Sequence, residues 1–508
     1  MSKFSDFARK LTSSVGGDSS APLILFLSGA NLGIMQFVAT RNLSSAFFGT
    51  EVVLFLVTAA YFLGYSAGYF ISDRLDPRSL RLFALAQWAT HLTFPFSWRW
   101  LGGVMGDSNH NTAMFFLLLF LGSFWSSSFY SVLLPRLLSR SRHADVEDFC
   151  RGYGLEILGA MAGFMLIGAV SLTAPAYLMV FYQANFVLLL YCLFLKDRRI
   201  LALGIALAAL YAVLLPGLDR ASVARLYESH GYEIDTILFS ADTPYQRVEI
   251  FENGEGVRQL YLDGIRHYGS DSLGEFNYFI AGLPVSLLKA PEVIVVGSGS
   301  FEAVAQALPA ARHVTSVEID PVVAAAGLRY LSGGRTPEHE PKWSIEIDDA
   351  KHYIANLTGS VDVVALDIAG PFQRQVALLY TQEFYELIKR HLRPGGILSV
   401  PANGDFQEGP ETASLIVTTL LSTFPDVFVV TRGNGRTSFA MAGTTLGFGK
   451  AELLKRMKAE GREDVVVYDR QDIQRHLQGR LIRPLSLANM DVVLKQGVDR
   501  LRRKFFKA

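Results

Sequence analysis

The first half of the chain alternates between long apolar stretches and short polar connections. Seven stretches have the length that a helix needs to cross a bilayer, about 20 residues. They cover residues 22–40, 48–72, 80–102, 112–134, 152–174, 176–195 and 200–216. A soluble protein would have to bury seven such helices in succession. The pattern therefore predicts a polytopic α-helical membrane domain over residues 21–219, behind an amphipathic segment at residues 1–20.

Pairs of glycines recur within these apolar stretches at a spacing of four residues. Gly64 and Gly68 form one pair, and Gly159 and Gly163 form another. Small residues at this spacing let two helix backbones approach closely, so we expect helix contacts at both pairs.

The pattern changes near Gly231 to that of an α/β protein. Alternating runs at residues 233–239, 246–251 and 257–262 predict a small antiparallel β-sheet over residues 231–270. An amphipathic helix is expected at 274–288. Strands and helices then alternate, which predicts a Rossmann-like domain with a parallel doubly wound sheet over residues 271–445. Residues 446–508 are expected to be helical and to end in a basic amphipathic tail.

Composition narrows the classes of partner and cofactor. Half of the 508 residues are hydrophobic, and 47 basic residues balance 47 acidic ones. With no net charge, nothing points to a nucleic-acid partner. Two cysteines, Cys150 and Cys192, exclude a disulfide framework and a multi-cysteine metal site, so we expect no bound metal.

The distribution of basic residues predicts an orientation in the membrane. They gather in the second, fourth and sixth connections, which the positive-inside rule places in the cytoplasm together with the N-terminus. Seven crossings would then leave the α/β domain outside, away from cytoplasmic nucleoside cofactors. We therefore expect that one of the seven stretches does not cross the membrane. The shortest stretch, 200–216, is the first candidate. The catalytic domain is expected on the cytoplasmic side of the inner membrane, where the basic tail suits an anionic leaflet.

The segment from Val293 to Asp320 has the layout of a nucleoside-binding β-α-β unit. An apolar run ends in Gly297-Ser298-Gly299, and a second apolar run ends at Glu318. Glycines let the backbone approach a ligand at a helix N-terminus, and an acidic residue about 20 positions further on can bind ribose hydroxyls.

Acidic residues also follow the next two predicted strands. Asp349 precedes Ala350 after one strand, and Asp367 follows the other. Each could simply cap a helix, but ligands of doubly wound sheets bind beyond the carboxyl ends of the strands. We assign Glu318 to ribose hydroxyls, Asp349 to an adenine amino group and Asp367 to a cationic or reacting group.

Four motifs resemble the polyamine aminopropyltransferases, the spermidine and spermine synthases, and the whole chain resembles their bacterial variant with an N-terminal membrane region. The motifs are YLDG (261–264), EFNY (275–278), VEID (317–320) and LYTQEFY (379–385). The resemblance implies an N-terminal β-sheet joined to a methyltransferase-type domain, and no prosthetic group. It implies that an amine attacks the aminopropyl carbon of decarboxylated S-adenosylmethionine and that methylthioadenosine leaves. It also implies pairing of soluble domains, so a homo-oligomer is possible.

The methylthioadenosine half of the family site is retained. The resemblance makes Asp367 the acid that accepts the amine proton. It also gives binding roles to Gln246, Glu318, Asp349 and Ala350, and it places Tyr245 and Tyr278 along the cleft.

The amine half departs from the family pattern. Ser300 and Gly370 stand where the family has acidic residues, and Gln373-Arg374 replaces a glycine-proline pair. A polyamine needs carboxylates to replace the water it sheds. We count Ser300 and Arg374, with Tyr380 of the LYTQEFY motif, among the substrate-binding residues.

Three functions follow from this pattern. A lyase could bind S-adenosylmethionine and let the substrate's own carboxylate displace methylthioadenosine, which gives homoserine lactone; the changed amine half favours it. An aminopropyltransferase with an unusual amine acceptor is the alternative. The third possibility is a sensor or transporter that only binds the nucleoside.

Overall fold

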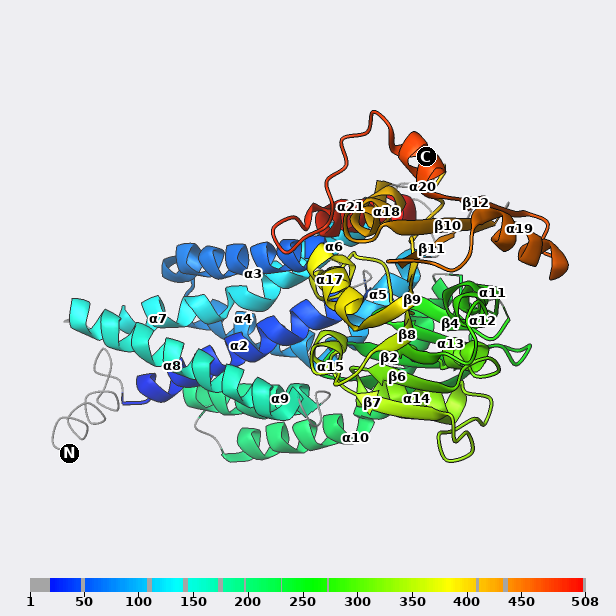
Figure 1. Cartoon of the computed structure of the whole chain (residues 1–508). Helices are drawn as coiled ribbons and strands as arrows, with labels where there is room; N and C mark the ends of the chain where they lie inside the picture. Colours follow the sequence, from blue (N-terminus) through cyan, green and yellow to red (C-terminus); the bar gives the residue numbers. More distant parts are fainter. Residues whose placement is uncertain are drawn as a thin grey trace. The chain divides into compact units, whose positions relative to one another are not determined.

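The computed structural model describes residues 19–505 except 47–50, 107–111, 140–144, 172–176, 196–197, 230, 272–273, 408–410 and 433–436. The chain divides into two compact units, residues 1–249 and residues 250–508 (Figure 1). Residues 1–18 lie outside the described part, so the amphipathic segment expected there stays a prediction.

The first unit is built from long helices. Short helical turns at Ser72–Arg74 and Tyr191–Leu195 extend α3 and α9. The helices are α2 (Ala21–Ala46), α3 (Glu51–Ile71), α4 (Pro77–Thr93), α5 (Phe96–Gly106), α6 (Thr112–Ser128), α7 (Tyr130–Leu138), α8 (Val146–Ser171), α9 (Leu178–Leu190) and α10 (Arg198–Ser229).

Two of the seven predicted spans are broken in the structure. The stretch 80–102 divides into α4 and α5 at Phe94-Pro95, because proline cannot continue the hydrogen-bond ladder of a helix. The stretch 112–134 divides into α6 and α7 at Phe129.

Four described helices are long and apolar enough to cross a membrane: Ala21–Leu43, Glu51–Arg74, Val146–Val170 and Leu201–Glu228. The last one contains the stretch 200–216 that we expected to be wrong, and it is the longest and most apolar of the four. Pro216 lies inside α10 without ending the helix, and the expectation about this span stays a prediction.

Glycines allow the helix contacts that the sequence predicted. A Cβ atom on Gly159 would lie 2.0 Å from the carbonyl oxygen of Phe26 in α2, and one on Gly64 would lie 1.9 Å from that of Phe124 in α6. No side chain larger than hydrogen fits at such a distance, so α2 packs backbone to backbone on α8, and α3 packs in the same way on α6.

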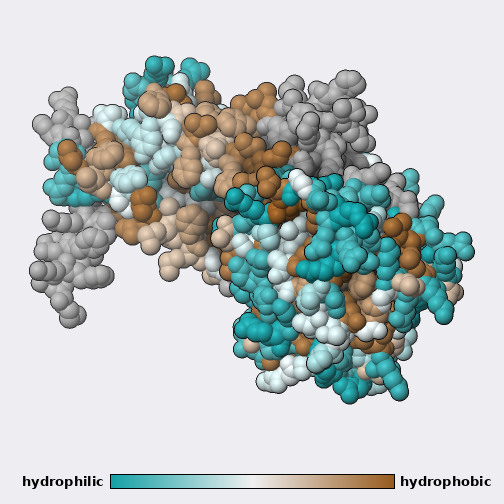
Figure 2. Space-filling view, turned by 45° about the horizontal axis from the view of Figure 1, so that its top comes forward, coloured by the Kyte–Doolittle hydropathy of each residue, from teal (hydrophilic) through white to brown (hydrophobic). Residues whose placement is uncertain are grey.

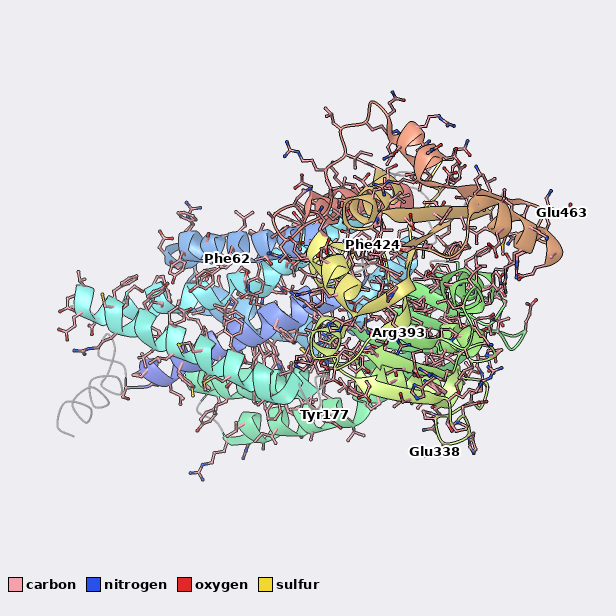
Figure 3. All side chains as sticks on the ribbon, viewed as in Figure 1. Phe62, Tyr177, Glu338, Arg393, Phe424 and Glu463 are labelled. Carbon is pink, nitrogen blue, oxygen red and sulfur yellow. The ribbon has the colours of Figure 1, made fainter. Side chains whose placement is uncertain are left out.

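The helices of the first unit turn many apolar side chains outward. Phe62 of α3 points outward (Figure 3) and is 59% exposed. Phe70 and Met165 are more exposed still. Hydrophobic residues colour much of the helical surface, whereas hydrophilic ones dominate the surface of the α/β unit (Figure 2). An apolar surface of this extent marks contact with a membrane or a partner.

A small sheet contains the boundary between the two units, which falls within its second strand. Its strands are β1 (Thr236–Asp242), β2 (Arg247–Glu252), β3 (Arg258–Leu262) and β4 (Ile265–Gly269), in that order. We did not predict β4. The signal was the Asp263-Gly264 pair, whose positive φ angles of 48° and 77° close a tight hairpin between β3 and β4.

The second unit is an eight-stranded sheet with helices on both faces. Its strand order is β12-β10-β11-β9-β8-β5-β6-β7. The strands are β5 (Glu292–Val296), β6 (His313–Glu318), β7 (Trp343–Ile347), β8 (Val361–Leu366), β9 (Leu392–Pro401), β10 (Asp426–Arg432), β11 (Ser438–Gly443) and β12 (Val465–Tyr468).

The predicted parallel sheet is confirmed only for part of these strands. The five strands from β9 to β7 are parallel, but β10, β11 and β12 pair antiparallel, so the sheet is mixed. Residues 446–508 supply β12 as well as the helices α19 (Lys450–Ala459), α20 (Arg470–Leu477) and α21 (Asp491–Phe505).

Separate apolar cores cover the two faces of this sheet. One contains residues of α15 (Ala350–Ala355), α17 (Gln382–His391) and α18 (Glu411–Thr423). The other contains residues of α13 (Glu302–Ala307), α14 (Pro321–Tyr330) and α19. The helix expected at 274–288 is interrupted by a π-turn at Tyr278–Gly282, between α11 (Gly274–Asn277) and α12 (Leu283–Ser286). With both faces covered, ligands reach this sheet only at its edges and strand ends.

Candidate active site

The glycine loop lies against the end of the neighbouring strand. Gly297 has φ +80°, and a Cβ atom there would come within 2.9 Å of the carbonyl oxygen of Asp367. On the other side of the loop, a Cβ atom on Gly327 would lie 2.1 Å from the carbonyl oxygen of Gly299. The loop is thus held between β8 and α14, which explains the need for glycine at Gly297 and Gly327.

Backbone hydrogen bonds align the four strand ends predicted to carry the site. The amide of Gly297 donates to Val317 (2.9 Å), that of Asp367 donates to Val296 (2.8 Å) and that of Asp348 donates to Glu318 (3.1 Å). The structure therefore brings the glycine loop, Glu318, Asp348 and Asp367 to one edge of the sheet, as the sequence indicated.

Glu318 is a buried carboxylate at the end of β6. Its side chain is 6% exposed and accepts a hydrogen bond from the amide of Asp320 (3.1 Å). Burial raises the pKa of Glu318 to about 7, and the charges of Asp320 and Asp367 add to this effect. The carboxylate also lies near the loop, 3.9 Å from the position of a Cβ atom on Gly299.

Asp367 follows β8 and is the second carboxylate with a strongly shifted pKa. Burial raises the pKa of Asp367 to about 7; the Ser298 hydroxyl opposes the shift and the charge of Glu302 adds to it. The buried Ser298 hydroxyl has no hydrogen bond of good geometry, so its contact with Asp367 is weak. Among the described residues no lysine or arginine forms an ion pair with Asp367. A carboxylate of this kind can accept a proton near neutral pH.

Asp349 has the helix-capping role that was its simpler interpretation. It is exposed, and its Oδ1 accepts hydrogen bonds from the amides of Lys351 (2.9 Å) and His352 (3.0 Å) at the start of α15. The following residue, Ala350, is buried. The predicted contact of Asp349 with an adenine amino group stays a prediction.

Tyr380 anchors the loop that follows Asp367. Its buried hydroxyl donates to the carbonyl oxygen of Ala369 (2.9 Å) and accepts from the side-chain amide of Asn403 (2.9 Å). Asn403 also lies against Gly370, where a Cβ atom would come within 3.2 Å of its side chain. Tyr380 therefore positions the loop, a role we had not assigned to it.

Sequence reasoning missed an acidic residue in the amine half. Ser300 is buried, and its hydroxyl accepts a hydrogen bond from the amide of Glu302 (3.3 Å) at the start of α13. Glu302 lies close enough to Asp367 for its charge to raise the pKa of that carboxyl. The signal was its place two residues after Ser300, at the first position of α13.

Several predicted substrate-binding residues make other contacts. The Tyr278 hydroxyl donates to Glu460, and the Arg462 guanidinium lies 4.1 Å from the centroid of its ring. Arg374 is exposed at the start of α16 (Arg374–Ala377). Tyr245 and Gln246 belong to the first unit, in the turn between β1 and β2, where the carbonyl oxygen of Gln246 accepts from the amide of Thr243 (2.9 Å).

Known proteins match the part of the chain that carries this site. Residues 276–431 match the spermine/spermidine synthase domain. A polyamine aminopropyltransferase of Sulfurisphaera tokodaii is 28% identical over 255 residues, 48% of this chain and 84% of that protein. A spermidine synthase solved with the transition state analogue AdoDATO is 19% identical over 54% of this chain and 89% of its own, with a TM-score of 0.39.

A second relative matches more than the α/β unit. The polyamine aminopropyltransferase of Oceanobacillus iheyensis is 24% identical over 393 residues, 73% of this chain and 75% of that protein. The second unit has 508 − 249 = 259 residues, so this match extends into the helical unit. Together with the motifs and the strand-end site, these matches support the spermine/spermidine synthase family for the part of the chain that carries residues 276–431.

Proposed function

We propose that the protein transfers the aminopropyl group of decarboxylated S-adenosylmethionine to an amine and releases methylthioadenosine. The observation that carries this proposal is the group of carboxylates around the glycine loop: Asp367, Glu318 and Glu302. No described lysine or arginine forms an ion pair with Asp367 or Glu318. A site with this charge favours cations, and both the sulfonium and the amine are cations.

Asp367 is the proton acceptor in this reaction. The amine nitrogen forms a bond to the aminopropyl carbon while the carbon–sulfur bond breaks, and the electron pair stays on sulfur. The attacking nitrogen loses its proton to Asp367, which is ionised above pH 7 according to its raised pKa. Glu318 binds the ribose hydroxyls, and Glu302 binds the ammonium group of the amine.

The lyase is the second candidate, and a specific observation favours it. Ser300 and Gly370 leave two positions of the amine half without a carboxylate. A substrate that carries its own carboxylate, S-adenosylmethionine, meets less repulsion there. Folded over the sulfonium, that carboxylate would displace methylthioadenosine and form homoserine lactone, with proximity supplying much of the rate.

One assay separates these functions. The purified full-length protein is incubated with S-adenosylmethionine or its decarboxylated form, each with and without putrescine or spermidine, and products are identified by mass spectrometry. Methylthioadenosine formed from the decarboxylated substrate only when an amine is present supports the transferase. Methylthioadenosine and homoserine lactone from S-adenosylmethionine alone support the lyase. Binding without turnover in every arm contradicts both and leaves a sensor or transporter.

We also propose that the first unit is embedded in the inner membrane and that the α/β unit is cytoplasmic. The outward apolar side chains of α3, α8 and α10 support the first part. Exposed Cys150, in the first turns of α8 next to the basic fourth connection, offers a test of the second part. In a Cys192→Ser background, a membrane-impermeant maleimide applied to intact spheroplasts is expected to label neither Cys150 nor the cysteine of Glu338→Cys. Labelling at position 338 alone would place the α/β unit outside the cell.

A further inference from the structure

A cavity of about 320 Å³ lies in the first unit, at the end of the helices that leads into β1. It is formed by the C-terminal part of α2, the beginnings of α5 and α9, the second half of α10, and β1 with the start of β2. This size falls within the range of small-molecule sites in proteins, about 300–1,000 Å³. None of its residues belongs to the candidate active site.

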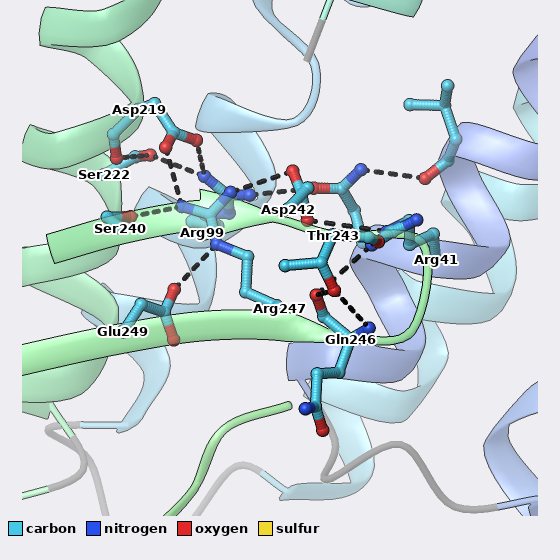
Figure 4. A network of polar contacts seen from close by, with 12 residues as sticks. Arg41, Arg99, Asp219, Ser222, Ser240, Asp242, Thr243, Gln246, Arg247 and Glu249 are labelled. Atoms are coloured by element: carbon cyan, nitrogen blue, oxygen red, sulfur yellow. Dashed lines mark hydrogen bonds and ion pairs between the residues drawn. The ribbon is translucent and has the colours of Figure 1, made fainter. Parts of the chain in front are cut away.

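One wall of the cavity is polar and rigid. Arg247 is buried and donates to Asp219 (2.6 Å) and Asp242 (3.0 Å), as Figure 4 shows. Arg99 is also buried and donates to the other oxygen of Asp219 (2.6 Å) and to Asn42 (2.8 Å). These ion pairs join α5 and α10 to the β-strands, so the wall is already formed before any ligand binds.

The lining carries more positive than negative charge. Four lining arginines, Arg41, Arg99, Arg220 and Arg247, stand against two lining aspartates, Asp219 and Asp242. Glu249, outside the lining, also pairs with Arg247 (2.8 Å), so one positive charge is in excess. Arg220 is exposed, and within the described part of the chain no ion pair or hydrogen bond involves its side chain. Arginine presents a planar fork of donors that matches a phosphate or a carboxylate. The surplus charge therefore disfavours amines and favours an anion.

The opposite wall is apolar. Its side chains come from α2, α5, α9 and α10, and α10 also carries part of the outward apolar surface of the unit. They are Phe37, Val38, Phe96, Leu178, Met179 and Leu215. A small soluble anion such as phosphate would leave these side chains without contacts, whereas hydrocarbon next to the anionic group would cover them.

We propose that this cavity binds an anionic amphiphile, a phospholipid whose phosphate contacts Arg220 and whose first acyl carbons cover the apolar wall. The proposal draws on the lining alone and on the membrane location, and it is independent of the reaction catalysed by the α/β unit. A lipid held here would place the β1–β2 connection next to the bilayer surface.

Native mass spectrometry of the full chain tests the proposal. The protein is purified in detergent and titrated with short-chain phosphatidylglycerol, with phosphatidylcholine of the same chain length, and with inorganic phosphate. We expect phosphatidylglycerol to bind at least tenfold more tightly than either of the others. Arg220→Gln is expected to weaken it by about tenfold or more, because a charge-assisted hydrogen bond is lost. Met179→Trp, which fills the apolar side, is expected to reduce binding as well.

Arg225→Gln is the matched control, since this arginine lies on the same helix outside the cavity and pairs with Glu228 (3.9 Å). Binding should change less than twofold. Equal affinity for phosphatidylglycerol and inorganic phosphate would mean that the cavity binds any anion, and it would contradict the proposal that the ligand is an amphiphile. Equal binding by wild-type protein and Arg220→Gln would overturn the site itself. Melting temperatures of all variants check that the fold is intact.

Discussion

Buried carboxylates are paired with arginines in the first unit but have no described cationic partner in the second unit. In the first unit, Asp219 and Glu249 each contact Arg247, and Asp219 also contacts Arg99. In the second unit, Glu318 and Asp367 are buried at strand ends, and the described residues offer neither of them an ion pair. Their pKa values rise to about 7 as a result.

This difference separates a structural role from a chemical one. A carboxylate paired with arginine holds structural elements together, and breaking such a buried pair costs stability. A buried carboxylate without such a partner exchanges its proton near neutral pH, and its burial costs stability in the empty site. We therefore expect substitutions in the first network to affect folding, and substitutions in the second to affect turnover. Five predictions test that comparison.

Asp367→Asn is expected to have the largest effect, on turnover. Loss of the proton acceptor should lower kcat by about 10²–10⁴-fold, the usual contribution of general base catalysis. The melting temperature should stay the same or rise, because a buried, unpaired carboxylate is removed. The measurement is methylthioadenosine release by the full-length protein, beside thermal unfolding. A variant that unfolds at a clearly lower temperature would mean that Asp367 has a structural role.

Arg247→Met is expected to have the next largest effect, on stability. It leaves Asp219, Asp242 and Glu249 without their shared partner, and breaking such a buried network costs about 3–5 kcal/mol. Thermal unfolding of the detergent-solubilised chain measures it. Arg258→Met is the control, because Arg258 pairs with Glu252 at the surface (2.7 Å), where a pair contributes at most about 1 kcal/mol. Equal losses for both variants would contradict the comparison.

The pH dependence of turnover and stability should run in opposite directions. Asp367 and Glu318 have folded pKa values of about 7, above those of the unfolded chain, so the folded state binds more protons between pH 4 and 7. Their contribution to stability is present below pH 4 and is lost as the pH rises through 7. Turnover needs ionised Asp367, so kcat/KM should rise up to tenfold per pH unit below 7 and then level off.

Asp367→Asn tests whether Asp367 causes part of this pH dependence. In this variant the free energy of unfolding should fall less between pH 4 and 7 than in the wild type. If its stability profile has the same slope as that of the wild type, another group carries the effect.

Glu302→Gln is expected to have the smallest effect. If Glu302 binds the ammonium group of the amine, the KM for spermidine should rise by about tenfold, with a smaller change in kcat. The exposed loop residue Glu338 provides a control in Glu338→Gln, which should change neither value. For a lyase, Glu302→Gln would leave the KM for S-adenosylmethionine unchanged or lower it.

Ser300→Asp gives the reverse test, because it restores the acid of the family pattern beside Glu302. Affinity for spermidine should improve. Gly370→Asp is less suitable, since a side chain there would press on Asn403 and disturb the anchor of the Tyr380 loop. No change in spermidine affinity with Ser300→Asp would show that the amine does not bind at this side of the loop.

The sequence predicted the parallel strands and the positions of their acidic ends well. Each strand from β5 to β8 is a run of five or six residues that local patterning is enough to recognise. Only the apolar second half of β9 was predicted, because Pro394, Gly395 and Gly396 interrupt the pattern at its start. The antiparallel strands β10 to β12 were not predicted. Their pairing depends on which edge of the sheet is free, and a single chain pattern does not contain that information.

The composition and periodicity of the chain by themselves predicted an apolar helical half and an α/β half. They also predicted the glycine loop at Gly297 and the carboxylates at Glu318 and Asp367. Only the tertiary structure decided how those charges behave. Burial without a cation raised the pKa values of Glu318 and Asp367, and the turn after Ser300 brought Glu302 to the same edge. The arginine network around Arg247 joins residues 28 positions apart, from Asp219 to Arg247, and the cavity beside it is a property of the packed helices. The sequence shows which charged groups are present, but their burial and their neighbours in the folded chain decide whether they pair or exchange protons.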